Sequence, residues 1–228
     1  RKNGVPPGQV AIRVRVDAGS LMEEDSERGF AHFLEHLLFR GSKYVPDGEA
    51  KRVWQRLGAT FGSDSNAQTS PTHTVYQLDL PNATASGLDE SIKILSGMVR
   101  EPKLDQRTID TEKSVVMAEQ RESDGPQQRQ GDAQREHVFA GQRLAVRSPI
   151  GTPKTIGGAT ASAIQAFHDR WYRPDRVVII ISGDGDPAQY AGLVAKYFGD
   201  WKADSAAPTD PDFGDPAKGK AVAKTIVV

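Results

Sequence analysis

The segment from Phe30 to Phe39 reads FAHFLEHLLF, and it constrains the fold more than any other part of the sequence. Only His32, Glu35 and His36 are polar in it, so a helix formed here is apolar nearly all round. A helix of that kind is buried in the core of a domain. We therefore expect this helix to be covered by other elements on nearly every side.

The three polar residues of this helix form a pattern that indicates a metal site. His32 and His36 are four residues apart, so their rings project from one face of the helix, one turn from each other. That spacing allows two imidazoles to bind one ion, as in the zinc helix with the reversed motif order. Glu35 lies on the same side, where it is placed to accept a proton from a metal-bound water. The alternative is a buried helix whose histidines bond only to backbone, but a buried carboxylate also needs a partner.

A third ligand must come from elsewhere, since catalytic zinc takes three protein ligands and leaves one position open for water. The chain contains no Cys, which leaves histidines and carboxylates. On the helix expected after Asp105, Ile109, Glu112, Val116 and Glu119 share one stripe. Glu119 as a ligand and Glu112 as a supporting or proton-handling carboxylate fit this placement. The alternative is a stripe at the domain edge with solvated carboxylates.

The other histidines are weaker candidates. His168 lies on the apolar stripe of Ile164, Phe167 and Trp171, which favours a core histidine. His73 borders an expected strand and could contact substrate, and His137 is expected at the surface.

Composition excludes several classes of protein. Hydrophobic residues make up 37% and charged residues 26%, as in ordinary globular proteins, and the formal net charge is −1. No basic stripe indicates nucleic acid or an anionic membrane as a partner. The longest apolar run, Val177 to Ile181, is far too short to cross a bilayer.

Hydrophobic periodicity and breakers predict the following elements. Strands are expected at 9–17, 74–80 and 176–182. Helices are expected from Asp25 or Ser26 to about Arg40, and at 47–57, 85–99, 105–122, 127–138, 162–171 and 187–198. Residues 59–73, rich in Gly, Ser, Thr and Asn, lead into the second strand, and a loop is expected around Pro149 to Pro153.

Long helices interleaved with separated strands predict an α+β fold, with a mixed, largely antiparallel sheet and helices packed mainly on one face. We expect one domain at 1–203, a linker at 204–219 rich in Pro, Gly and Asp, and the start of a following domain at 220–228. The chain begins without Met and ends on a strand pattern, so we expect a fragment of a longer protein.

With these residues in hand, the chain resembles the pitrilysin-like family of zinc peptidases, which includes insulin-degrading enzyme and the mitochondrial processing peptidases. The resemblance covers nearly the whole chain. It is carried by AGS at 18–20 with Glu24, GFAHFLEHLLFRGS at 29–42, SNAQT at 65–69, EKSVVMAE at 112–119 and WYRPDRVVIIISGD at 171–184.

The resemblance implies one Zn²⁺ per chain, bound by His32, His36 and Glu119. It also implies Glu35 as general base, Glu112 as a supporting acidic residue, and an edge strand at Asn66 and Ala67 to which a peptide substrate adds. In one departure, Ser148-Pro149-Ile150-Gly151 stands where the family often has His-Pro-Tyr-Gly.

The implied activity is that of a zinc endopeptidase domain. Family members pair similar domains into a clamshell around the peptide, so we expect further domains of the same chain or a partner subunit, in a homo- or heterodimer. The isolated segment is then expected to be weakly active or inactive. The alternatives are a non-catalytic peptide-binding subunit of the same fold and a purely structural metal domain. Bacterial relatives are frequently exported, which favours the periplasm.

Overall fold

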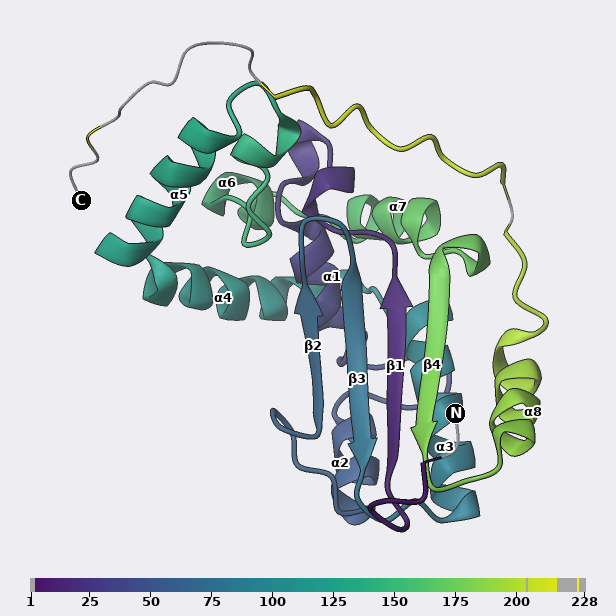
Figure 1. Cartoon of the computed structure of the whole chain (residues 1–228). Helices are drawn as coiled ribbons and strands as arrows, with labels where there is room; N and C mark the ends of the chain where they lie inside the picture. Colours follow the sequence, from purple (N-terminus) through teal and green to yellow (C-terminus); the bar gives the residue numbers. More distant parts are fainter. Residues whose placement is uncertain (1–2, 204, 217–224, 226–228) are drawn as a thin grey trace.

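The computed structural model describes residues 3–203, 205–216 and 225 (Figure 1). It has an α+β fold, as predicted. The strands are β1 (Val10–Val16), β2 (Ser65–Thr69), β3 (Thr74–Leu80) and β4 (Val177–Gly183). The α-helices are α1 (Phe30–Leu38), α2 (Glu49–Arg56), α3 (Ala85–Arg100), α4 (Gln106–Ser123), α5 (Pro126–Val138), α6 (Pro153–Gly157), α7 (Ala161–Trp171) and α8 (Pro187–Phe198). Short 3₁₀ turns lie at Ser20–Met22, Asp25–Glu27, Arg143–Val146 and Pro174–Arg176.

The four strands form one sheet in the order β2-β3-β1-β4, and each pairing among these described strands is antiparallel. β1 lies between β3 and β4, which come from distant parts of the chain. Val14, for example, lies opposite Tyr76 of β3 on one side and Ile179 of β4 on the other. The sheet thus joins residues near both ends of the sequence into one layer.

Helices cover one face of this sheet and leave the other open, as Figure 1 shows for α1, α2 and α3 behind the strands. Along β1 the covered face carries Val10, Ile12, Val14 and Val16, each 3% exposed or less. The open face carries Arg13, whose guanidinium is paired with the carboxylate of Asp79 at 2.6 Å. This alternation is the pattern of a sheet with one buried and one solvated face.

The helix α1 begins later than the sequence predicted. Asp25 and Ser26 belong to a separate 3₁₀ turn, and Gly29, with φ of 94°, changes the chain direction before Phe30. The prediction of a continuous helix from Asp25 or Ser26 was therefore wrong. The first amides of α1 are instead satisfied by Glu23, whose two carboxyl oxygens accept hydrogen bonds from the N–H groups of Gly29 and Ala31, both at 2.9 Å.

The strand β2 was not predicted from periodicity, which showed only a polar segment there. It is an edge strand of the sheet, and Asn66 and Ala67 lie on it, as the family resemblance implied. The short helix α6 likewise lies within a segment expected to be a loop.

The extended segment after α8 is fastened to the domain rather than free of it. Arg176 donates to the carbonyl of Pro208 at 3.2 Å and to the carboxylate of Asp210 at 2.6 Å, and the N–H of Arg143 donates to the carbonyl of Phe213 at 2.8 Å. The predicted following domain at 220–228 lies, apart from Thr225, outside the described residues. The domain boundary remains a prediction. In the part of the chain that the structure describes, no helix has the length and apolarity needed to span a membrane.

Candidate metal centre and peptidase site

Packing of α1 against α4 brings three possible metal ligands together, as predicted. The Nε2 atoms of His32 and His36 lie 3.3 Å apart. The carboxylate of Glu119 contributes Oε1 at 3.6 Å from His32 Nε2 and Oε2 at 3.3 Å from His36 Nε2. One donor atom from each of the three residues lies within 4.8 Å of the others.

These separations suit a tetrahedral zinc ion. With Zn–N and Zn–O bonds of about 2.0–2.2 Å, the edge of a tetrahedron between two ligand atoms is roughly 3.3–3.6 Å. The donor set is also two imidazoles and a carboxylate, which zinc accepts. A cation between the two imidazole nitrogens and the carboxylate would be within reach of all three. The residues therefore fit the metal.

Glu112 supports this arrangement from behind His36. Its Oε1 lies 3.0 Å from His36 Nδ1, and its Oε2 accepts a hydrogen bond from Arg40 Nε at 2.5 Å. With Nδ1 donating to Glu112, the lone pair of His36 Nε2 points toward His32 and Glu119. Glu112 is 4% exposed, so this carboxylate sits in the core-facing stripe that the sequence predicted. A carboxylate that orients a ligating imidazole is a common second partner of metal sites.

Glu35 occupies the same cavity but contacts the opposite wall. Its Oε2 accepts a hydrogen bond of 2.5 Å from the hydroxyl of Thr69, on the edge strand β2. The Thr69 hydroxyl is in turn 3.3 Å from that of Thr74, which donates to the carbonyl of Ala18. The carboxylate is thus held by a side chain from the sheet, while its helix carries the two histidines.

Burial and the neighbouring charges shift the pKa values of these groups in different directions. Burial, with the adjacent His36, lowers the pKa of His32 to about 4, so its imidazole is neutral near pH 7. The pKa of His36 is raised overall: burial acts to lower it, but the hydrogen bond from its ring to Glu112 and the charge of that carboxylate outweigh burial. Burial raises the pKa of Glu35, partly offset by the Thr69 hydroxyl.

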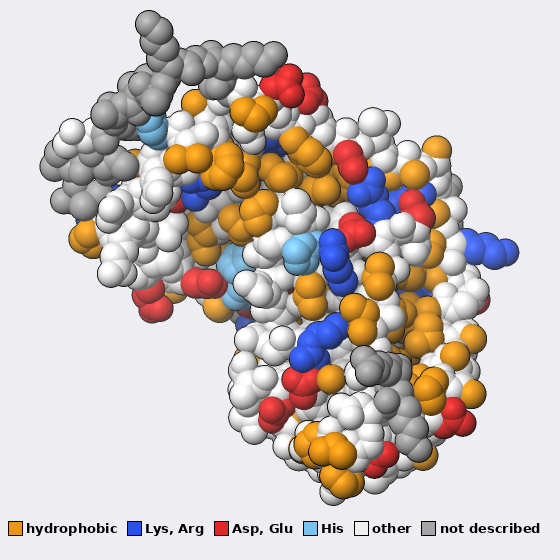
Figure 2. Space-filling view, in the orientation of Figure 1, with side chains coloured by type: hydrophobic (Ala, Val, Ile, Leu, Met, Phe, Trp, Pro, Cys, Tyr) orange, Lys and Arg blue, Asp and Glu red, His pale blue; other side chains and the backbone are white. Residues whose placement is uncertain are grey.

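Two hollows open on either side of the histidines. One, of about 510 Å³, is lined by Phe39, Lys51, Phe61, Asn66 and Val115 together with the metal-site residues. The other, of similar volume, runs past Thr69 toward Arg135 and Ser148. Figure 2 shows histidine and acidic side chains reaching the surface on the β2 side of the sheet. The site is accordingly a trough across which an extended chain can lie.

The free edge of β2 forms one wall of this trough. Backbone bonding alternates along an antiparallel pair. The N–H of Ser70 bonds to the carbonyl of His73 across the hairpin, so Ala67 and Thr69 direct their backbone groups outward. The N–H of Ala67 is covered by the amide oxygen of the Asn66 side chain at 2.9 Å. Ala67 therefore presents its carbonyl at the edge, while the Asn66 side chain bonds to the N–H of Ala67 and donates to the carbonyl of Gly62 at 3.1 Å.

The remaining histidines lie away from the three candidate ligands. His168 is 4% exposed and bonds to the carbonyl of Val99 at 2.9 Å, which confirms the prediction of a core histidine. The ring of His73 contacts the hydroxyls of Ser70 and Thr72. Sequence reasoning missed Thr69 and Arg40 as partners of Glu35 and Glu112. Both stand inside the quoted motifs, but neither motif says what their side chains contact.

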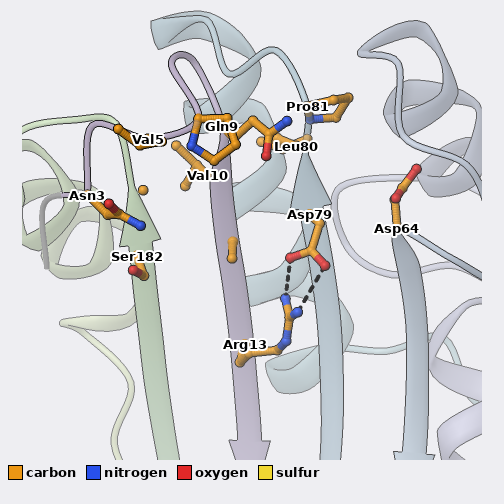
Figure 3. A pocket seen from close by; sticks show the side chains of 13 residues that line it. Asn3, Val5, Gln9, Val10, Arg13, Asp64, Asp79, Leu80, Pro81 and Ser182 are labelled. Carbon is orange, nitrogen blue, oxygen red and sulfur yellow. Dashed lines mark hydrogen bonds and ion pairs between the residues drawn. The ribbon is translucent and has the colours of Figure 1, made fainter.

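A third hollow, of about 460 Å³, lies at the far end of the open sheet face (Figure 3). Its central charges, Arg13 and Asp79, bond to each other at 2.6 and 2.9 Å. These two charges therefore balance each other, and the remaining carboxylate of the hollow, Asp64, accepts a bond from the N–H of Thr60 at 2.8 Å.

The site combines an inverted His-x-x-Glu-His motif on a buried helix with a glutamate from a distant part of the chain, and it lies beside a strand edge. This arrangement is that of a metallopeptidase. The chain belongs to the insulinase family, peptidase family M16, whose model matches residues 3–146. A second model, described as the peptidase M16 inactive domain, matches residues 158–227. The two matched parts share one sheet here, because β4 of the second pairs with β1 of the first.

Similar proteins include proteases from bacteria and plants. The probable zinc protease PqqL of Escherichia coli is 33% identical over 89% of this chain and 22% of its own length. The chloroplastic stromal processing peptidase of Pisum sativum is 30% identical over 89% of this chain and 16% of its own. The crystal structure of the first half of the periplasmic protease PqqL superposes with a TM-score of 0.86 at 31% identity, covering 92% of this chain and 46% of that one. Pitrilysin, at 22% identity and a TM-score of 0.77, shares the fold.

The chain therefore spans about a fifth of the length of the curated relatives that it matches.

Proposed function

We propose that this chain is the zinc-bearing domain of an endopeptidase. The observation that supports this most is the set of 3.3–3.6 Å separations among His32, His36 and Glu119, with Glu35 in the same cavity. His32, His36 and Glu119 would hold the ion. A zinc ion held there supplies Lewis acidity, which makes water more acidic and polarises a carbonyl.

The residues around the site have separate tasks in this proposal. Glu35 accepts a proton from the attacking water and later delivers it to the departing amine. Burial, which raises the pKa of its carboxyl, brings that group closer to the pH at which both transfers are efficient. Glu112 keeps the proton of His36 on Nδ1, which leaves Nε2 free to act as a ligand.

The peptide would bind as an added strand along the free edge of β2. The backbone groups of Ala67 and Thr69 face that edge, and the side-chain amide of Asn66 lies beside them. Main-chain bonding of this kind holds a peptide extended with little dependence on its sequence.

The whole peptidase needs more than this domain. Residues of α1, α4 and β2 line the trough, and this chain spans 46% of the PqqL half that it matches. We propose that further domains, or a partner subunit in a homo- or heterodimer, enclose the trough, and that residues 1–228 alone are weakly active or inactive. The likeness to a periplasmic protease supports a periplasmic location.

Metal removal tests the proposal on the full-length protein. Turnover of an unstructured peptide should disappear on chelation and return with one equivalent of zinc. Peptide binding without turnover, with zinc present, would instead indicate a non-catalytic binding subunit. Turnover unaffected by complete zinc removal would refute the metallopeptidase proposal.

A further inference from the structure

The hollow on the Asn66 side of the metal site contains a cation that the proposed mechanism does not use. Lys51, on α2, places its ammonium 3.6 Å from the ring centre of Phe61 and 5.7 Å from that of Phe39. Both rings line the same hollow as His32, Glu35 and His36. Lys51 is half-buried, so its position is set by this packing rather than by free rotation in solvent.

Neighbouring charges leave Lys51 unbalanced. Arg40 is paired with Glu112 at 2.5 Å and with Asp47 at 3.7 Å. Among the residues that the structure describes, no ion pair within 4.0 Å joins a carboxylate to Lys51. Burial, and then the charge of Arg40, lower the pKa of Lys51, and the charges of Glu112 and Asp47 offset only part of this effect.

Besides the charged and polar residues of the metal site, apolar side chains also line this hollow. Phe61 is 42% exposed and Val115 is 44% exposed, and together with Phe39 they form walls around the ammonium. Exposed aromatic and aliphatic groups gathered at one place indicate a binding surface. Methylene groups of a bound side chain can pack on these walls while its end reaches Lys51. The contents of the hollow therefore match a side chain that is aliphatic along its length and anionic at its tip.

We propose that Lys51 is a specificity-determining residue that selects a glutamate side chain in the substrate near the cleaved bond. This proposal rests on the proposed peptidase function. The two positive charges of a bound zinc ion would be balanced by Glu35 and Glu119, and Arg40 balances Glu112. The positive charge of Lys51 then remains to attract the substrate. A hydrogen-bonded charge pair in a half-buried site discriminates strongly against a neutral amide of the same shape.

The test uses matched pairs of quenched fluorescent peptides that differ only in Glu or Gln at each of the three positions on either side of the cleaved bond. In the full-length wild-type protein, one position should show kcat/KM about 3–10-fold higher for Glu than for Gln, as expected for a partly solvated charge contact. That ratio should fall to about one in Lys51→Met and persist in Lys51→Arg. Lys154→Met, which removes the same charge from exposed α6, should keep it.

Binding of the same peptide pairs to Glu35→Gln separates this proposal from the peptidase function. If the wild type cleaves nothing, the peptidase function fails, and a Glu preference in binding that is lost in Glu35→Gln/Lys51→Met still supports the Lys51 proposal. A Glu-to-Gln ratio of one or less at every position, in cleavage or in binding, would overturn it. So would a ratio that survives in Lys51→Met while the zinc content is unchanged.

Discussion

The carboxylate of Glu112 lies 3.0 Å from Nδ1 of His36, although 76 residues separate the two in the sequence. The same carboxylate accepts a bond from Arg40, which lies one turn further along the chain beyond His36. Glu112 therefore joins the last turn of α1 and the residues just after it to α4. Its replacement should disturb the metal site without removing any ligand.

We predict that Glu112→Gln lowers zinc affinity about 10–100-fold, as is typical when the partner of a ligating histidine is changed. The reason is that glutamine no longer carries the charge that favours the His36 tautomer with its proton on Nδ1. Competition with a zinc-binding dye measures this. Glu122→Gln, at the exposed end of the same helix, is the control and should bind zinc like the wild type.

Glu119→Gln should have a larger effect, because it removes a ligand rather than its support. We expect protein purified without added metal to contain much less than one zinc per chain, while the wild type contains one. Metal analysis by mass spectrometry measures the stoichiometry. Equal zinc in the two proteins would exclude Glu119 from the ligand set.

Thr69 should position Glu35 through its hydroxyl alone. Thr69→Val keeps the shape but removes the donor, so we expect kcat to fall about 10-fold with zinc content and KM little changed, in line with the loss of one hydrogen bond to a charged group. Thr69→Ser keeps the hydroxyl and should restore most of kcat. If Val and Ser behave alike, the hydroxyl has no such role.

Glu23 should make stability depend on pH. Burial raises its pKa to about 8, against the bonds from Ala31 and Gly29 and the charge of Arg147, which lower it. The folded protein then keeps this proton until about pH 8, whereas the unfolded chain releases it near pH 4.5. The contribution of Glu23 to the free energy of unfolding is therefore fully present below pH 4.5 and is lost as the pH rises through 8. The loss is about 3–5 kcal/mol in all, since one pKa unit corresponds to about 1.4 kcal/mol.

Urea unfolding of the wild type and of Glu23→Gln across pH 5 to 9 measures this loss. The variant should lack the decline that Glu23 causes, even if it is less stable throughout because the amide cannot accept both backbone bonds. Parallel pH profiles in the two proteins would show that Glu23 does not carry the proton.

The helix with His32 and His36 and its glutamate-bearing partner were predictable because both leave a strong local signal. Buried helices show their faces in the sequence, so His32, His36 and the stripe with Glu112 could be placed before the fold was known. The start of α1 could not, since Asp25 and Ser26 are good capping residues locally. The turn at Gly29 and the bonds from the Gly29 and Ala31 N–H groups to the buried carboxylate of Glu23 set the start of α1 at Phe30 instead.

The edge strand illustrates the opposite case. Residues 65–69 alternate between small and polar side chains, and their strand conformation comes from pairing with β3 rather than from their own propensity. The bond between Thr69 and Glu35 joins residues 34 apart through that pairing. Similarly, Lys51 meets Phe61 only once α2 is packed beside the loop that leads into β2. Contacts of this kind depend on the assembled structure.

The most direct test of the peptidase assignment is a comparison of Glu35→Gln with the wild type in the full-length protein, with zinc content and turnover measured on the same preparations. Glutamine has nearly the same shape but cannot accept the proton. We predict one zinc per chain in both proteins and turnover about 10²–10⁴-fold lower in the variant, the usual cost of losing a general base. Turnover within a few-fold of the wild type, at equal zinc content, would contradict the account and assign the proton transfer to another group.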